Sequence, residues 1–151
     1  QRSERRIIRD SLALVGLDHL IDRRCDHLSG GERRRAVIAR GLAQGADLIM
    51  LDEPTNHLDV RHQLMLLDTL RASGRTVVAT IHDLGMAASH FDHVVVLADG
   101  GVLSAGPTRE ALSPSNVATA FHVVAHHVTT PDGSQELVCT APLPNPDREE
   151  N

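Results

Sequence analysis

The chain has 151 residues, of which 41% are apolar, 23% are charged and 1% are aromatic, and its net charge is −5. A chain of this length can bury one core. The acidic balance and the scarcity of aromatic rings argue against nucleic acid as a partner, because phosphates attract basic surfaces and exposed bases stack on aromatic side chains. Cys25 and Cys139 lie far apart without the spacing of metal ligands, so they predict no disulfide framework.

Helical and strand patterns alternate along the chain, which predicts an α/β fold. A helical stripe from Ile7 to Val15 is ended by Gly16, and a second helix is expected from Gly30 or Gly31. The apolar run 48–51 predicts a strand of a parallel sheet covered on both faces, and Pro54 prevents its continuation. The next elements are expected in this order: helix 61–70, strand 76–81, helix 84–89 and strand 94–97.

The last third of the chain predicts a smaller set of elements. Asp99, Gly100 and Gly101 indicate a turn that pairs strand 94–97 with a strand at 102–105. Further along we expect helices at 109–112 and 115–121 and β-like runs at 123–128 and 136–139. The end is rich in Pro, Asp, Glu and Asn, which predicts disorder.

The first chemical signal is Ser29-Gly30-Gly31 at the start of a predicted helix. Backbone N–H groups and the positive end of the helix dipole can face an anion there, and glycine permits close approach of the backbone. Phosphate is the natural ligand of such a site. Taken alone, the same residues fit an ordinary helix N-cap equally well.

Two further signals come at the ends of predicted strands. Asp52 and Glu53 follow the apolar run 48–51, the usual place for ligand groups in open α/β sheets. The first carboxylate can hold Mg²⁺ and the second can polarise an attacking water. His82 ends the next predicted strand, where an imidazole can bond a phosphate oxygen and orient that water.

One part of a complete nucleotide site does not occur in the sequence. The chain contains no lysine and therefore no G-x-x-x-x-G-K-[ST] loop, the element that cradles the β-phosphate. The sequence is therefore expected to be the second half of an ATPase and to lack hydrolysis by itself.

Together these motifs resemble the ABC ATPases. Residues 28–32, with Arg35 and 38–40, resemble their signature motif, which usually ends in Gln where this chain has Glu32. Residues 48–55 resemble the Walker B strand, 56–59 the D-loop and 80–83 the H-loop. The resemblance implies the C-terminal half of an ABC-type P-loop ATPase, with a RecA-like parallel sheet, flanking helices and part of the helical subdomain. Residues 1–45 would end that subdomain, 46–106 would form part of the core, and 107–151 would be an accessory segment.

The resemblance also implies a role for each residue. ATP would be sandwiched in a head-to-tail dimer of two ATPase subunits, and Ser29, Gly30, Gly31 and Glu32 would lie at the ATP bound by the opposite subunit. Asp52 would help to hold Mg²⁺, Glu53 would be the general base and His82 the γ-phosphate sensor, while Asp59 would link the two sites. A carboxylate at Glu32 is unfavourable beside phosphate unless it points away, for example towards Arg33 or Arg35.

Three functions remain open at this point. Residues 83–88 and 106–112 resemble ATPases of iron-siderophore, haem or cobalamin importers, which is the reading we favour. Such a subunit would be cytoplasmic and peripheral on the inner face of the membrane, held by transmembrane permease subunits, because no apolar run approaches the ~20 residues of a membrane span. Residues 52–59 and Glu32 also fit the ribosome-binding translation factors of the F subfamily. The third possibility is a non-catalytic truncated cassette.

Three histidines near the C-terminal end raise the question of a metal site. The spacing of His122, His126 and His127 suits ligands on a helix, but the surrounding valines favour a strand, so exposed polar histidines are the expected outcome.

Overall fold

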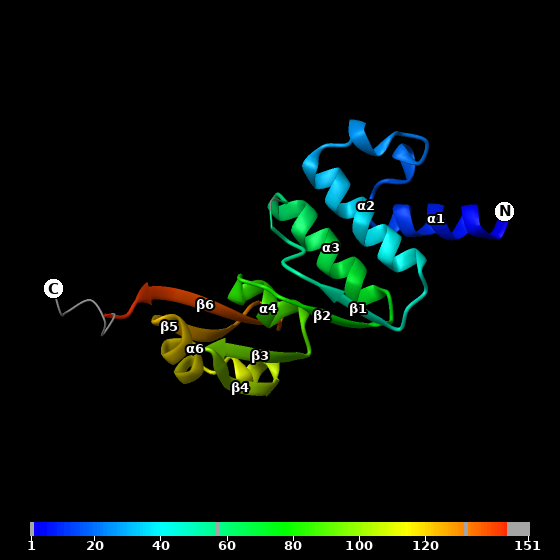
Figure 1. Ribbon diagram of the computed structural model, residues 1–151. Coiled ribbons are helices and arrows are strands. Elements are labelled where there is room, and N and C mark those ends of the chain that lie inside the picture. The colour runs from blue at the N-terminus through cyan, green and yellow to red at the C-terminus, as the bar shows by residue number, and fades with distance from the viewer. Residues whose placement is uncertain (1, 57, 132, 145–151) are drawn as a thin grey trace. The chain divides into compact units, whose positions relative to one another are not determined.

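The computed structural model describes residues 2–56, 58–131 and 133–144. The chain divides into two compact units, residues 1–81 and 82–151, and Figure 1 labels most of their helices and strands. The disorder predicted for the C-terminal end falls mainly on residues 145–151, which lie outside the described residues. The subdomain boundaries expected at residues 45 and 106 stay a prediction.

The first unit contains helices and a short parallel sheet. Its elements are α1 (Arg2–Leu14), the 3-10 turns η1 (Asp18–Leu20) and η2 (Cys25–His27), α2 (Gly30–Ala43), β1 (Leu48–Leu51), α3 (Val60–Ala72) and β2 (Thr76–Ala79). Strands β1 and β2 pair in parallel, with Ile49 opposite Val77. The connection between them is α3, as a parallel pair requires a long crossover.

The core of this unit joins the helices to one face of the sheet. Apolar residues three and four positions apart share one helix face, and for this reason α2 and α3 each bury a stripe. The buried cluster consists of Val15, Leu17, Ile38, Ala39, Leu42, Ile49, Leu66 and Leu70. Gly16, with φ of +71°, ends α1 in the left-handed conformation that suits glycine.

The other face of the sheet is exposed. Leu48 is 51% exposed, Met50 74% and Val78 51%, whereas Ile49 between them is buried. Strand side chains alternate between faces, so an apolar face is left uncovered here. The expectation that this strand is covered on both faces is therefore met on one face only by the described residues of the first unit.

The second unit consists of two β-hairpins with short helices. Its elements are α4 (Leu84–His90), β3 (His93–Ala98), β4 (Gly101–Pro107), α5 (Thr108–Ala111), α6 (Pro114–Phe121), β5 (Val123–Thr129) and β6 (Gln135–Pro142). Strands β3 and β4 are antiparallel, as are β5 and β6. The turn residues Asp99 and Gly100 have φ of 49° and 75°, as a tight hairpin turn requires. Helix α6 packs on β5, and α4 packs on β6.

The elements occur in the order expected from the sequence, with ends shifted by a few residues. Strand β2 ends at Ala79 rather than at residue 81, and the run around His126 is a strand, as its valines predict.

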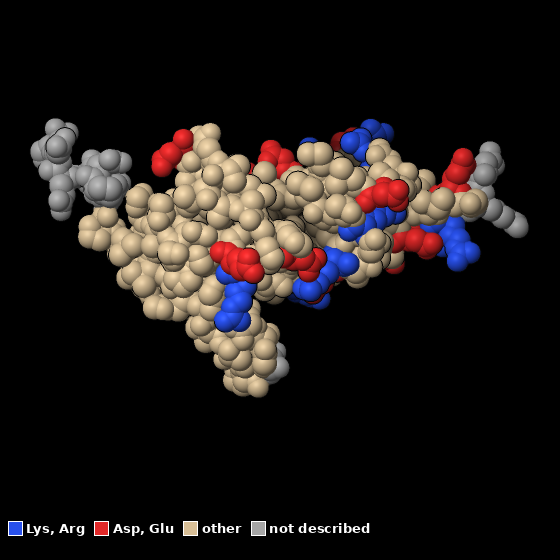
Figure 2. Space-filling view, turned by 90° about the horizontal axis from the view of Figure 1, so that it is seen from below, with Lys and Arg blue, Asp and Glu red and all other residues tan. Residues whose placement is uncertain are grey.

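Cys25 and Cys139 are free and exposed. On the face shown in Figure 2, arginine and acidic side chains lie beside one another. No helix of the described residues is long and apolar enough to cross a bilayer.

Candidate functional site

The start of α2 is closed by a capping box between Ser29 and Glu32. The Glu32 backbone N–H donates to Ser29 Oγ over 3.3 Å, and the Ser29 backbone N–H donates to Glu32 Oε2 over 2.7 Å. These bonds from Ser29 to the carboxylate hold the pKa of Glu32 below its ordinary value. The carboxylate is thus bound to the backbone of its own helix start rather than to Arg33 or Arg35, the partners considered from the sequence.

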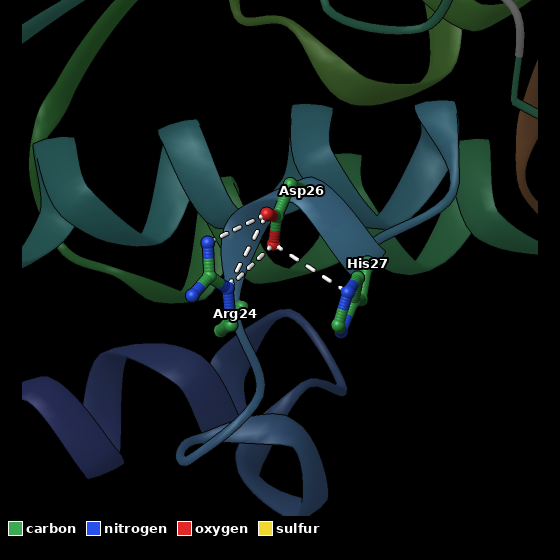
Figure 3. A network of polar contacts seen from close by, with 3 residues as sticks. All are labelled: Arg24, Asp26 and His27. Atoms are coloured by element: carbon green, nitrogen blue, oxygen red, sulfur yellow. Dashed lines mark hydrogen bonds and ion pairs between the residues drawn. The ribbon is translucent and has the colours of Figure 1, made fainter.

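The segment before Ser29 is tied by a local ion pair. Arg24 Nε donates to Asp26 Oδ1 over 3.1 Å, and its Nη2 donates to Oδ2 over 2.9 Å. His27 Nε2 lies 4.0 Å from Asp26 Oδ1, and the three side chains are drawn in Figure 3. The Arg24 guanidinium lowers the pKa of Asp26. Because all three side chains are exposed, these ion pairs contribute little to the free energy of unfolding.

Gly30 and Gly31 are not required by the packing of this chain. Neither has a positive φ, so neither is needed for an unusual backbone conformation. A Cβ added at Gly30 meets nothing within 4 Å, and one added at Gly31 lies 3.5 Å from Leu58 Cδ2, an ordinary contact. Glycine costs helix stability compared with alanine. Among the described residues, neither backbone conformation nor packing requires glycine at these two positions.

The D-loop residues lie at the same place as the signature. Asp59 caps α3: its Oδ1 accepts the His62 backbone N–H over 2.9 Å, and its Oδ2 lies 2.7 Å from His62 Nδ1. These bonds lower the pKa of Asp59. A hollow of about 420 Å³ is lined by signature and D-loop residues that include Ser29, Gly31, Glu32, Arg35, Leu58 and Asp59. The lining residues of the two motifs are 23 or more residues apart in sequence, as Arg35 and Leu58 show, and they form one concave surface.

Asp52 and Glu53 form a second group at the end of β1. The Thr80 hydroxyl donates to Asp52 Oδ1 over 2.7 Å and accepts the Glu53 backbone N–H over 2.7 Å. The Asn56 side-chain amide donates to the Glu53 carboxylate. Asp52 is exposed, so its carboxylate can reach a cation, and oxygen ligands suit Mg²⁺. Within the described part of the chain, neither carboxylate is among the residues that line the hollow at Ser29.

The predicted site residues therefore fall into three places. Ser29, Gly31, Glu32 and Asp59 line one hollow, with Gly30 beside them at the helix start. Asp52 and Glu53 share the hydroxyl of Thr80. His82 is exposed and is the first residue of the second unit.

Sequence reasoning missed Thr80 and Asn56. A threonine at the end of the strand that neighbours an Asp-Glu pair is a usable signal, because parallel neighbours bring such ends together.

Comparison with known proteins decides the family. A family model described as ABC transporter matches residues 2–56. The cobalamin import ATP-binding protein BtuD of Halobacterium salinarum is 41% identical over 143 residues, which are 92% of this chain and 35% of that protein. The iron(3+)-hydroxamate import ATP-binding protein FhuC of Bacillus subtilis is 38% identical over 93% of this chain and 54% of that protein. The chain belongs to the ABC transporter family of ATP-binding proteins.

Solved structures agree with this family and its fold. The chain resembles the inward-facing structure of a protein described as a metal-chelate type ABC transporter, with a TM-score of 0.77 and 28% identity over 89% of this chain and 56% of that one. It also resembles the dimeric ABC transporter cassette MJ0796, with a TM-score of 0.62 and 29% identity over 70% of this chain and 47% of that one. The predicted fold class, the C-terminal portion of an ABC ATPase cassette, is confirmed. The chain spans about a third to a half of the length of the curated relatives given above.

Proposed function

We propose that this ABC chain supplies the signature, Walker B, D-loop and H-loop residues of an ATP-hydrolysing subunit of a metal-chelate importer. The observation that carries the proposal is the pair Gly30 and Gly31. Glycine there is needed neither for backbone conformation nor for packing, and it lies at a helix start, where N–H groups bind phosphate. A phosphate that binds to the backbone N–H groups would explain these glycines, because a side chain there would keep the phosphate away.

In this function the two groups of residues act on different ATP molecules. Ser29, Gly30 and Gly31 bind the γ-phosphate of ATP held by a second ATPase subunit in a head-to-tail dimer, and Asp59 links the two sites. Asp52 holds Mg²⁺ for the subunit's own ATP, Glu53 acts as general base and His82 contacts the γ-phosphate. The separation of Asp52 and Glu53 from the hollow at Ser29 supports this division.

We infer the substrate class and the partners of the complete protein from the names of its relatives. BtuD is named for cobalamin import and FhuC for iron(3+)-hydroxamate import, and the hemin import ATP-binding protein HmuV of Bordetella pertussis is 37% identical over 84% of this chain and 53% of that protein. These names favour an importer over a translation factor of the F subfamily. An importer subunit would dock on transmembrane permease subunits at the cytoplasmic face of the membrane.

The chain by itself should not hydrolyse ATP, since it has no lysine to contact the β-phosphate. Calorimetry with ATP and Mg²⁺ should detect no micromolar binding. Turnover by the isolated chain that Glu53→Gln abolishes would contradict this part of the proposal.

The function is tested in a complete cassette, formed by this chain behind the N-terminal portion of the Bacillus subtilis relative. Glu53→Gln should lower hydrolysis by about 100-fold or more while ATP binding persists, because glutamine keeps the shape of the side chain and cannot accept the proton. His82→Ala should lower kcat more than it weakens ATP binding. Asp47→Asn, an exposed change before β1, is the control for loss of one acidic charge. Unchanged turnover in Glu53→Gln would refute the assignment.

The importer assignment needs a separate measurement. The complete subunit should co-purify with a membrane permease, and uptake of a metal chelate should be lost with Glu53→Gln. Association with ribosomes and with no permease would instead place the protein among the translation factors.

A further inference from the structure

Arg34 is a residue of the signature helix with a contact that the motif roles do not explain. Its Nη2 donates to the Asp52 backbone carbonyl over 3.1 Å and also to the Glu53 carbonyl. The partners are 18 and 19 residues away in sequence. One guanidinium thus connects α2 to the backbone of the two carboxylate residues.

The segment that Arg34 contacts has little regular structure of its own. Strand β1 ends at Leu51, so the carbonyls of Asp52 and Glu53 no longer belong to the sheet. Glu53 has φ of 45°, a conformation that non-glycine residues adopt at a cost and hold only when their surroundings fix them. The Glu53 carbonyl also accepts the Asn56 backbone N–H over 3.2 Å. The turn thus has one hydrogen bond of its own, and further donors and acceptors reach it from Arg34 on α2 and from Thr80 after β2.

The position of Arg34 on the helix suits this contact. Ile38, four residues further along α2, is buried in the core, and residues four apart share a helix face. Arg34 is half-buried on that side, whereas its neighbour Arg33 is exposed. A charged donor is roughly twice as strong as a neutral one towards a carbonyl.

We propose that Arg34 is a positioning residue, which holds the Asp52–Glu53 backbone to the signature helix so that the Glu53 carboxylate keeps its place for catalysis. This inference rests on the proposed function of Glu53 as general base. It adds that the helix which meets the partner's ATP also fixes the general base of its own subunit.

The kinetic test uses the complete cassette. Arg34→Ala should lower kcat about ten-fold, the effect of losing charged hydrogen bonds to a reacting segment, while KM for ATP stays within about two-fold. Arg34→Lys should recover most of the activity, because an ammonium group can still donate to both carbonyls. Arg33→Ala removes the same charge from the exposed neighbour and should leave kcat unchanged. Equal loss in Arg33→Ala and Arg34→Ala, or a change in KM alone, would overturn the proposal.

A second measurement uses the chain itself and is independent of hydrolysis. Hydrogen exchange at the Glu53 and Asn56 amides should be about five-fold faster in Arg34→Ala, because local opening of the turn becomes easier, while the urea midpoint of the first unit changes little. Unchanged exchange at both amides would overturn the role of Arg34. If the complete cassette with native Arg34 hydrolyses no ATP, the proposed function fails, and the exchange result still decides whether Arg34 holds the turn.

Discussion

Ser29 and Glu32 hold each other by two reciprocal hydrogen bonds at the start of α2, with the Ser29 N–H donating to Glu32 Oε2 over 2.7 Å. Glu32 stands where the signature motif usually has Gln, and its carboxylate accepts a hydrogen bond from the backbone of Ser29 at the start of the same helix. The N–H groups of Gly30 and Gly31 follow directly in the helix, where an anion is favoured. A glutamate is thus compatible with a phosphate-binding signature in this chain.

The first prediction concerns pH and Glu32. Because folding lowers the pKa of this carboxyl from its ordinary value of 4.5, its bonds stabilise the fold above that pH and are lost as the pH falls through the lower folded pKa. Glu32→Gln should therefore lower the urea midpoint at pH 7, and the difference from the native chain should shrink as the pH falls below 4.5 and through the lower folded pKa of Glu32. Asp47→Asn is the matched control, with an exposed acidic residue in the same unit. A difference that persists at low pH would show that charge at Glu32 is irrelevant.

The second prediction separates stability from function at Gly31. Alanine fits there at ordinary contact distance, so Gly31→Ala should leave the isolated chain at least as stable, with a gain below the ~1 kcal/mol of a helix interior because Gly31 is in the first turn of α2. In the complete cassette the same methyl group should weaken ATP-dependent dimer formation, because it lies where the phosphate must approach.

Gly41→Ala is the control for this prediction, since a Cβ at Gly41 meets nothing within 4 Å and the residue is in the same helix. Thermal unfolding and sedimentation with ATP measure the two effects. Normal ATP-dependent dimers of Gly31→Ala would mean that the glycine has no role at phosphate.

Much of the first unit could be predicted from sequence because its signals are local. The apolar stripe of α2, the short run of β1 and the glycine after α1 each depend on neighbours within a few residues. The bonds of Thr80 and Arg34 could not be predicted in the same way, since they depend on how β1 and β2 pair and on which turn of α2 faces the end of β1. The Ser-x-x-Glu pattern of residues 29–32 is a sequence signal for the capping box, and local geometry rather than the charge of Arg33 or Arg35 decides the partner of Glu32.

The third prediction concerns the exposed face of the β1–β2 sheet. Parallel sheets are normally covered on both faces, and Met50 on this face is 74% exposed. The isolated chain should therefore self-associate at micromolar concentration, and Met50→Gln should reduce the association. Val37→Gln, which changes an exposed apolar residue on α2, should reduce it less. Sedimentation velocity distinguishes these cases, and a native chain that remains monomeric at high concentration would contradict the expectation.

The central claim is that the signature of this chain acts on ATP bound by the other subunit. It is tested by counting the ATP molecules retained per dimer in complete cassettes that carry Glu53→Gln. Two further changes are combined in these dimers. The first is Ser29→Arg, which places a long side chain where phosphate approaches. The second removes the phosphate-binding lysine of the N-terminal portion. With the two defects in different subunits, one composite site stays intact and the dimer should retain one ATP. With both defects in one subunit beside a partner without them, both sites are broken and the dimer should retain none. The reverse result, one ATP with both defects in one subunit and none with the defects apart, would show that the signature serves its own subunit and would contradict the account.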